Sequence, residues 1–269
     1  MFNTCLGGLW MNLVKLNSEL VGEGVSIQEM FKLLQLYSEV RDYTKLRKIV
    51  FKENYLSKNS DSRIENILRA FKKRFLSNFG LPPAEFVGEI IKSDLSDAGK
   101  KQILFPYYLY SDNLLRLAYL DLVVASFKLG RSLTLDHTDV LDFLKEIGKR
   151  HNNVGKWSKY LKRKWATRFL TFLRAFGVLG KFPDNRLKKI HVKPSTFAFF
   201  TLWFTSNGQP FQSILSHDVW EMYLLDRDEV MELAHAASRK GWWLIEISGD
   251  IISFQPNYTL EEWLRYGVE

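Results

Sequence analysis

The feature that most constrains the fold is a run of rings and leucines in the second half of the chain, repeated at three- and four-residue spacing. The run consists of Trp157, Tyr160, Leu161, Trp165, Phe169, Phe172, Leu173 and Phe176. An α-helix places residues at this spacing on one stripe, because one turn takes 3.6 residues. Gly177 follows at once and is typical of a helix C-terminus. We therefore predict one long helix over 157–176 with its aromatic stripe in a core.

The first half of the chain indicates an all-helical bundle. Ser26-Ile-Gln-Glu29 and Ser62-Arg-Ile-Glu65 have the capping-box pattern and predict two helix starts. Ser111-Asp112 supplies a cap between two apolar stretches, which predicts helices at about 96–110 and 112–127. The fold class we expect is therefore mainly α.

Two short β-hairpins are expected in the second half. Residues 178–194 alternate in polarity around the turn Pro183-Asp-Asn185, which predicts a short basic hairpin. Near the end of the chain, Gly249-Asp250 suits a type II′ turn between strands 242–248 and 251–255.

The C-terminal hairpin also has a predicted register. It pairs Ile245 with Phe254 and Ile247 with Ile252, and so places these four residues on one face. A helix that Asp226 caps precedes the hairpin, and a helix followed by a hairpin is how a winged helix ends.

A change in charge and polarity suggests where the chain divides. The segment Gly148-Lys-Arg-His-Asn-Asn153 has a linker-like composition, and the sequence becomes strongly basic there. We predict a helical bundle over 1–150 and a helix-turn-helix or winged-helix-like domain over 151–269.

Composition narrows the functional classes. The chain has one cysteine, Cys5, in 269 residues, so it forms no internal disulfide, and no Cys/His spacing resembles a zinc finger. Its longest apolar runs are too short to cross a bilayer, and its start lacks signal-peptide features. We expect a cytoplasmic protein without a membrane partner.

No catalytic centre, cofactor site or metal site is predicted. The histidines are scattered, and neither HExxH nor GxxxxGK[ST] occurs. Asp226, Asp228 and Glu229 could suggest a metal-dependent nuclease, but helix capping explains them better.

The distribution of charge points to a polyanionic partner. The formal net charge is +8, and from Gly148 to His217 the only acidic residue is Asp184. Against it stand Lys149, Arg150, Lys156, Lys159, Lys162, Arg163, Lys164, Arg168, Arg174, Lys181, Arg186, Lys188, Lys189 and Lys193. Such a block attracts polyanions and releases counterions from a phosphate backbone. An ordinary solvated positive face is the alternative.

Candidate binding residues follow from the predicted helix and hairpin. Away from the aromatic stripe we expect Lys156, Lys159, Arg163, Thr167 and Arg174, with Lys162, Lys164 and Arg168 at its margins. The basic hairpin adds Arg186, Lys188 and Lys189. These side chains would meet phosphates, and Thr167 a phosphate or a base edge. A separate set in the first half could bind RNA: Arg69, Lys72, Lys73 and Arg74.

Several segments, taken in their order along the chain, resemble the BrxA family of BREX anti-phage defence systems. They are the run from Leu34 to Leu56, Ser62-Arg-Ile-Glu65, Lys72-Lys-Arg-Phe75, Gly7-Gly8-Leu9 and Arg174-Ala-Phe-Gly-Val-Leu179. The resemblance covers roughly residues 4–180. Glu19 to Met30 looks like an insertion, and the tail beyond about Phe199 is longer than is typical.

This resemblance implies a NusB-like helical part, a helix-turn-helix or winged-helix part, and binding of double-stranded DNA. Other BREX subunits would do the chemistry, and some of them are possible partners. Because of the departures, no site residue is carried over. We expect a non-enzymatic DNA-binding accessory protein; the alternatives are an adaptor that docks an acidic partner subunit, and RNA binding through the NusB-like bundle.

Overall fold

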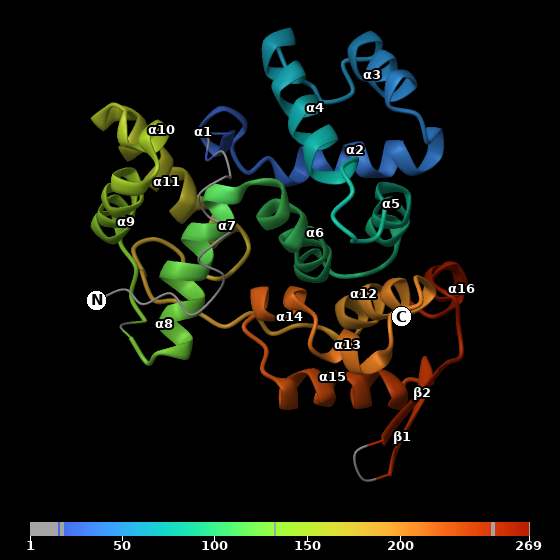
Figure 1. Ribbon diagram of the computed structural model, residues 1–269. Coiled ribbons are helices and arrows are strands. Elements are labelled where there is room, and N and C mark those ends of the chain that lie inside the picture. The colour runs from blue at the N-terminus through green and yellow to red at the C-terminus, as the bar shows by residue number, and fades with distance from the viewer. Residues whose placement is uncertain (1–15, 17–18, 132, 249–250, 269) are drawn as a thin grey trace. The chain divides into compact units, whose positions relative to one another are not determined.

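The chain forms two compact units, each built from two separated segments. The computed structural model (Figure 1) describes Leu16 and residues 19–131, 133–248 and 251–268. Unit 1 consists of residues up to Val25 together with Tyr108–Lys188, and unit 2 of Ser26–Tyr107 together with Lys189–Glu269. This division differs from the predicted single boundary near residue 150, because residues on both sides of 150 belong to unit 1.

Unit 1 is helical. Its helices are α1 (Glu19–Glu23), α7 (Asn113–Tyr119), the π-helical turn η1 (Leu120–Val124), α8 (Ala125–Lys128), α9 (His137–Arg150), α10 (Asn152–Gly155) and α11 (Lys159–Ala175). Helix α6 (Asp97–Ser111) contributes its last residues to unit 1 and the rest to unit 2. Helix α11 packs against α9 and α1.

The long predicted helix is confirmed as α11, but Trp157 lies before its N-cap Ser158 and Tyr160 lies outside the core. The Ser158 hydroxyl accepts a hydrogen bond from Leu161 N at 3.1 Å and caps the helix start. Trp165 and Phe169 are fully buried and stacked, with ring centroids 5.3 Å apart. Tyr160 was placed wrongly in the core: its side chain is 72% exposed. It precedes Lys164 by four residues, and this spacing assigns it to the polar side of the helix.

The predicted linker at 148–153 is wrong. Gly148 lies inside α9, and its backbone contacts that of Gly155 in α10, since a Cβ atom on Gly148 would lie 3.0 Å from Gly155 Cα. The two glycines allow α9 and α10 to approach closely. The start of α9 has a complete capping box between Asp136 and Asp139.

The predicted basic hairpin at 178–194 is found only as one short antiparallel bridge and not as two regular strands. Leu179 and Leu187 form only an isolated bridge. Hydrogen bonds from Gly180 N to Arg186 O at 3.0 Å and from Lys188 N to Val178 O at 2.7 Å join the two arms. The returning arm also bonds a second segment, because Leu187 N donates to Leu133 O at 2.6 Å and Leu135 N donates to Asn185 O at 2.9 Å. The segment is a loop supported by a neighbouring loop, which the polarity pattern could not reveal.

Unit 2 holds the remaining helices and the sheet. Its helices are α2 (Ile27–Val40), α3 (Tyr43–Lys52), α4 (Asp61–Phe75), α5 (Ala84–Lys92), most of α6, α12 (Pro194–Ser206), α13 (Phe211–Leu215), α14 (Asp218–Met222), α15 (Arg227–Arg239) and α16 (Leu260–Tyr266). Strands β1 (Trp243–Ser248) and β2 (Ile251–Pro256) form the sheet found in the described residues. The mainly helical fold class is confirmed.

Gln102 of α6 joins the two segments of unit 2. Its amide Nε2 donates to His191 O at 2.7 Å, and its Oε1 accepts from Thr196 Oγ1 at 3.0 Å and from Lys193 N at 3.1 Å. The Gln102 carbonyl accepts from Tyr223 Oη at 2.7 Å. A buried amide with both ends bonded costs little, and it locates the start of α12 on α6.

Two predicted caps are wrong and two are confirmed. Ser26 has φ 39° and makes no side-chain cap, and α4 begins at Asp61 rather than after Ser62. Asp112 accepts from Leu115 N, and Asp226 forms a full capping box with Glu229. Both serine patterns lie within two residues of an observed helix start. The helices were therefore placed correctly, although their capping residues were not.

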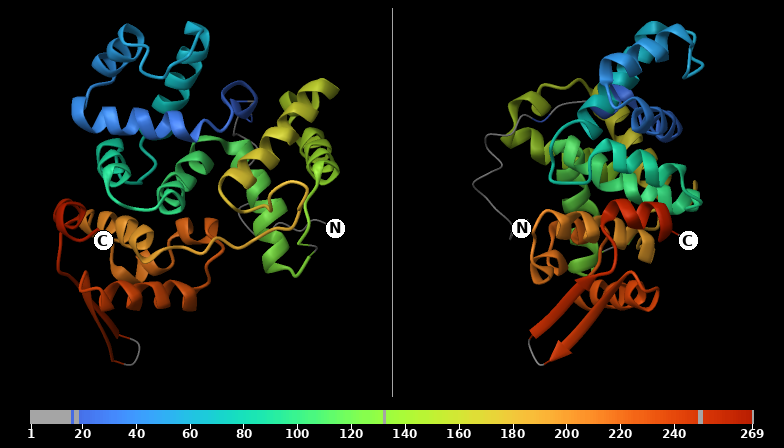
Figure 2. Two further views of the ribbon diagram at one scale, coloured as in Figure 1. Left: turned by 180° about the vertical axis from the view of Figure 1, so that it is seen from behind. Right: turned by 90° about the vertical axis from the view of Figure 1, so that its right-hand side faces the viewer.

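The C-terminal hairpin has the predicted register. Ile245 pairs with Phe254 and Ile247 with Ile252, whereas Gly249-Asp250 lies outside the described residues. The Phe254 ring stacks on Phe211 at 4.1 Å between centroids. Figure 2 shows the hairpin extending away from α15 in both views. The order of α15 and then β1–β2 matches the expected helix followed by a hairpin.

No helix in the described ranges is long and apolar enough to cross a lipid bilayer.

Gly88 of α5 should be essential for the packing of α5 on α2. A Cβ atom there would lie 2.6 Å from Ser38 Cβ and closer still to the Leu34 carbonyl oxygen. We expect Gly88→Ala to lower the free energy of unfolding by about 1–3 kcal/mol, because the backbone of Leu34 cannot move away from the added methyl group. Gly22→Ala is the control, since nothing lies within 4 Å of its added methyl. Equal unfolding midpoints in urea for both variants would contradict this packing.

Candidate nucleic-acid interface

The outer side of α11 carries a polar stripe, which we define as Tyr160, Arg163, Lys164, Thr167 and Thr171. Each of these residues lies three or four positions from another member, on the side opposite Trp165 and Phe169. All are exposed except the half-buried Lys164. Burial of the aromatic side of the helix therefore turns the polar stripe toward solvent.

The threonines of the stripe are bonded within the helix. Thr167 Oγ1 donates to Arg163 O at 3.1 Å, and Thr171 Oγ1 donates to Thr167 O at 2.8 Å. The His137 Nε2 atom lies 3.2 Å from the same Arg163 carbonyl. Because its hydroxyl proton is already used, Thr167 offers only oxygen lone pairs, which do not bind phosphate.

The basic side chains at the start of α11 differ in their exposure and in their neighbours. Lys156, Lys159 and Arg163 are exposed. Lys162 Nζ lies 3.4 Å from Gly155 O, and Lys164 Nζ lies 6.0 Å from the Tyr160 ring centroid. None of the ion pairs found in the described part of the chain involves a residue between 156 and 168. This cluster of positive charge is therefore not neutralised by neighbouring carboxylates there.

Arg168 has a different environment. The Cβ position of Gly24 lies 3.5 Å from Arg168 Nη1, so the guanidinium packs over the backbone after α1. Half-buried and at the margin of α11, it supports the unit as well as adding charge.

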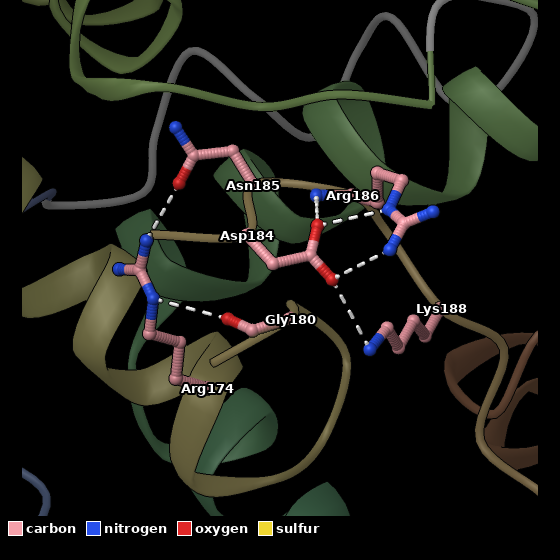
Figure 3. A network of polar contacts seen from close by, with 6 residues as sticks. All are labelled: Arg174, Gly180, Asp184, Asn185, Arg186 and Lys188. Atoms are coloured by element: carbon pink, nitrogen blue, oxygen red, sulfur yellow. Dashed lines mark hydrogen bonds and ion pairs between the residues drawn. The ribbon is translucent and has the colours of Figure 1, made fainter. Parts of the chain in front are cut away.

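At the other end of α11, Arg174 holds a loop. Its Nε donates to Gly180 O at 3.2 Å and its Nη2 to Asn185 Oδ1 at 2.7 Å (Figure 3). Arg174 was predicted to project away from the aromatic stripe toward a phosphate, but its guanidinium is bonded to this loop instead. The side chain is long enough to reach back to the chain that follows Gly177, and it bonds there.

Asp184 organises the cations of the same loop. Its carboxylate accepts from Arg186 Nε at 3.0 Å and from Arg186 N at 3.0 Å, and it lies 3.3 Å from Lys188 Nζ (Figure 3). The bonds from Arg186 hold the pKa of Asp184 well below its usual range. Arg186 and Lys188 are exposed as expected, but they share one negative charge.

Lys189 belongs to unit 2 and does not join this group. Its Nζ lies 2.5 Å from both carboxylate oxygens of Glu229 on α15. The alternating charges did not indicate a partner forty residues away.

The candidate RNA residues on α4 are only partly accessible. Arg69 and Lys72 are exposed, with Lys72 Nζ 5.2 Å from the Tyr43 ring centroid, and Lys73 is half-buried. Arg74 is 5% exposed, so its prediction as a binding residue is wrong. It lies on the same side of α4 as Phe71 and Phe75, which are buried too.

Two exposed aromatic residues of the basic segment were missed, Tyr160 and Phe182. Tyr160 could have been found from its four-residue spacing to Lys164. Phe182 is 84% exposed between Lys181 and Pro183, and no periodicity in the sequence marks it. Within the described ranges, no group of three or more His, Cys, Asp or Glu side chains could hold a metal ion.

Comparison with known proteins places the chain in a family. The model of the BrxA family matches residues 15–201. This chain belongs to the BrxA family. Membership implies a protein associated with BREX phage-defence systems, as the resemblance had indicated, and the family is not known as a catalytic one. No curated protein sequence matches the chain.

A solved structure shares the fold of this BrxA-family protein. It is the crystal structure of an uncharacterized protein from Magnetospirillum magneticum, with 16% sequence identity and a TM-score of 0.56. The alignment covers 75% of this chain and 97% of that chain.

Arg174→Gln should loosen the loop after α11. We expect faster amide hydrogen exchange over residues 178–187, because the shorter amide cannot reach both Gly180 O and Asn185 Oδ1. Arg163→Gln on the same helix is the control and should leave exchange in this loop unchanged. Unaltered protection in Arg174→Gln would mean that the two hydrogen bonds do not hold the loop.

Proposed function

We propose that this protein is a DNA-binding accessory component of a BREX system and that it holds duplex DNA mainly by its phosphates. The observation that carries the proposal is the exposed group Lys156, Lys159 and Arg163, which has no ion pair in the described part of the chain. Lysine and arginine side chains on an exposed helix are the ordinary ligands of DNA phosphates.

The spacing of these cations supports a combined action. Lys159 and Arg163 are four residues apart, which is about 6 Å along a helix axis. This is shorter than the Debye length of about 8 Å at physiological ionic strength, so their fields add. The aromatic core behind them keeps the helix from turning these charges away.

The set of binding residues is smaller than the sequence predicted. Arg174 and Arg74 support the fold, and Lys189 pairs with Glu229, so we exclude these three from the interface. We retain the cations from Lys156 to Lys164 as the centre, with Arg168, Arg186 and Lys188 at its edge. Thr167 donates to its own helix and is therefore not counted among the phosphate ligands, although its oxygen can still accept from a base amino group.

The triple variant Lys159→Glu, Arg163→Glu, Lys164→Glu tests the interface. We expect a loss of at least about tenfold in affinity for plain duplex DNA, with the slope of log affinity against log salt lower by about 0.9 for each lost contact. Fluorescence anisotropy over a salt series measures both quantities. Thermal unfolding confirms that the variant is folded.

A matched control separates the site from net charge. Lys45→Glu, Lys48→Glu, Lys52→Glu places the same charge change on exposed positions of α3 in unit 2. Equal losses in both triple variants would contradict an interface on α11.

Two outcomes would favour the other functions. A chain that shifts no duplex at physiological salt fits an adaptor for an acidic partner subunit. Stronger binding to RNA than to DNA of equal length, lost on changing Arg69 and Lys72, fits the helical bundle of unit 2.

A further inference from the structure

We propose that Phe182 is a wedge that inserts between base pairs at a deformed step of bound duplex DNA. The inference rests on the proposed DNA binding and deepens it, because it names the form of duplex that the protein prefers. Apolar wedges of this kind, among them Phe and Pro, partly unstack a step and kink the helix axis.

The first observation is the exposure of the loop tip. Phe182 is 84% exposed, and its neighbours Lys181 and Pro183 are exposed as well. A single exposed apolar residue is common on protein surfaces and alone would mean little. Phe182 differs from such residues because several hydrogen bonds hold the base of its loop.

The base of the loop is held at several points. Arg174 bonds Gly180 O and Asn185 Oδ1, one on each side of the tip. A Cβ atom on Gly180 would lie 2.8 Å from Asp184 Cβ and closer still to its carboxyl carbon, so the two sides touch. A wedge must resist the restoring force of base stacking, and a loop ordered before binding loses less entropy when it binds.

The neighbouring loop strengthens this support. Leu135 N donates to Asn185 O and Leu187 N donates to Leu133 O, so the returning strand of the tip is bonded to a second segment of unit 1. The hydrogen bonds described above reach residues that precede Lys181 or follow Pro183. The tip itself therefore projects from an ordered base.

The charges around the tip suit DNA. Residues 181–188 contain three basic side chains, Lys181, Arg186 and Lys188, and one acidic side chain, Asp184, which leaves a net charge of +2. Arg186 and Lys188 hold the carboxylate of Asp184 in ion pairs, so it does not stand alone toward a phosphate. A ring that directly follows Lys181, on a loop with a net positive charge, suits a base step flanked by two phosphates.

The polar stripe of α11 leads to the same loop. Its three- and four-residue spacing continues from Thr171 to Arg174, the residue that holds the loop. Phosphate contacts at the first turns of α11 and a wedge after its end can therefore act on one duplex.

The experiment compares the wild-type chain with Phe182→Ala. The probes are a duplex with a central 2-aminopurine, whose fluorescence rises on unstacking, and matched duplexes with and without one central mismatch. We expect wild-type protein to raise the fluorescence and to bind the mismatched duplex about tenfold more tightly, since a mismatched step costs less to unstack. Phe182→Ala should lose both effects and keep its salt-dependent binding to the perfect duplex. Phe182→Trp should retain both.

Leu244→Ala removes an exposed apolar side chain from β1 and is the control, since Leu244 is 54% exposed. It should behave as wild type. Unstacking by Phe182→Ala equal to that of wild type would overturn the wedge, as would an equal loss of affinity for both duplexes. A preference for single strands that depends on Phe182 would indicate base stacking instead and would also overturn it. Failure of the proposed function looks different, because wild-type protein would then bind neither duplex.

Discussion

The burial of one side of α11 is the constraint on which the candidate interface depends. Trp165, Phe169 and Phe172 are fully buried, and each such ring contributes on the order of 2–3 kcal/mol. A rotation of the helix would expose these rings, so the direction of the opposite side is set by the core. The exposure of Arg163 and the reach of Arg174 to the following loop are consequences of that burial.

A second constraint operates in unit 2, where a single amide joins distant parts of the chain. Gln102 bonds His191, Lys193 and Thr196 through its side chain. A buried amide left without these partners would be costly, so the segment at 191–196 has one favoured position on α6. This explains why residues from the end of the chain complete a unit that begins at Ser26.

Only part of the basic block in the sequence forms a positively charged surface. Some of its members support the fold, as Arg174 does, and others have carboxylate partners, as Lys189 has in Glu229. Asp184 shares its charge between Arg186 and Lys188. What is left for a polyanion is concentrated on the first turns of α11 and on the loop tip. The proposed phosphate contacts and the proposed wedge lie at these two places.

The sequence by itself determined the helical class, the place of α11, the caps at Asp112 and Asp226, and the register of the C-terminal hairpin. These features depend on spacing and on contacts between near neighbours, which a pattern records directly. Tertiary structure alone decided that Gly148 is a helix contact, that Arg74 is buried and that residues 178–188 form a supported loop. Each of these depends on partners distant in the chain or on which side of a helix meets the core, and no local pattern contains that information.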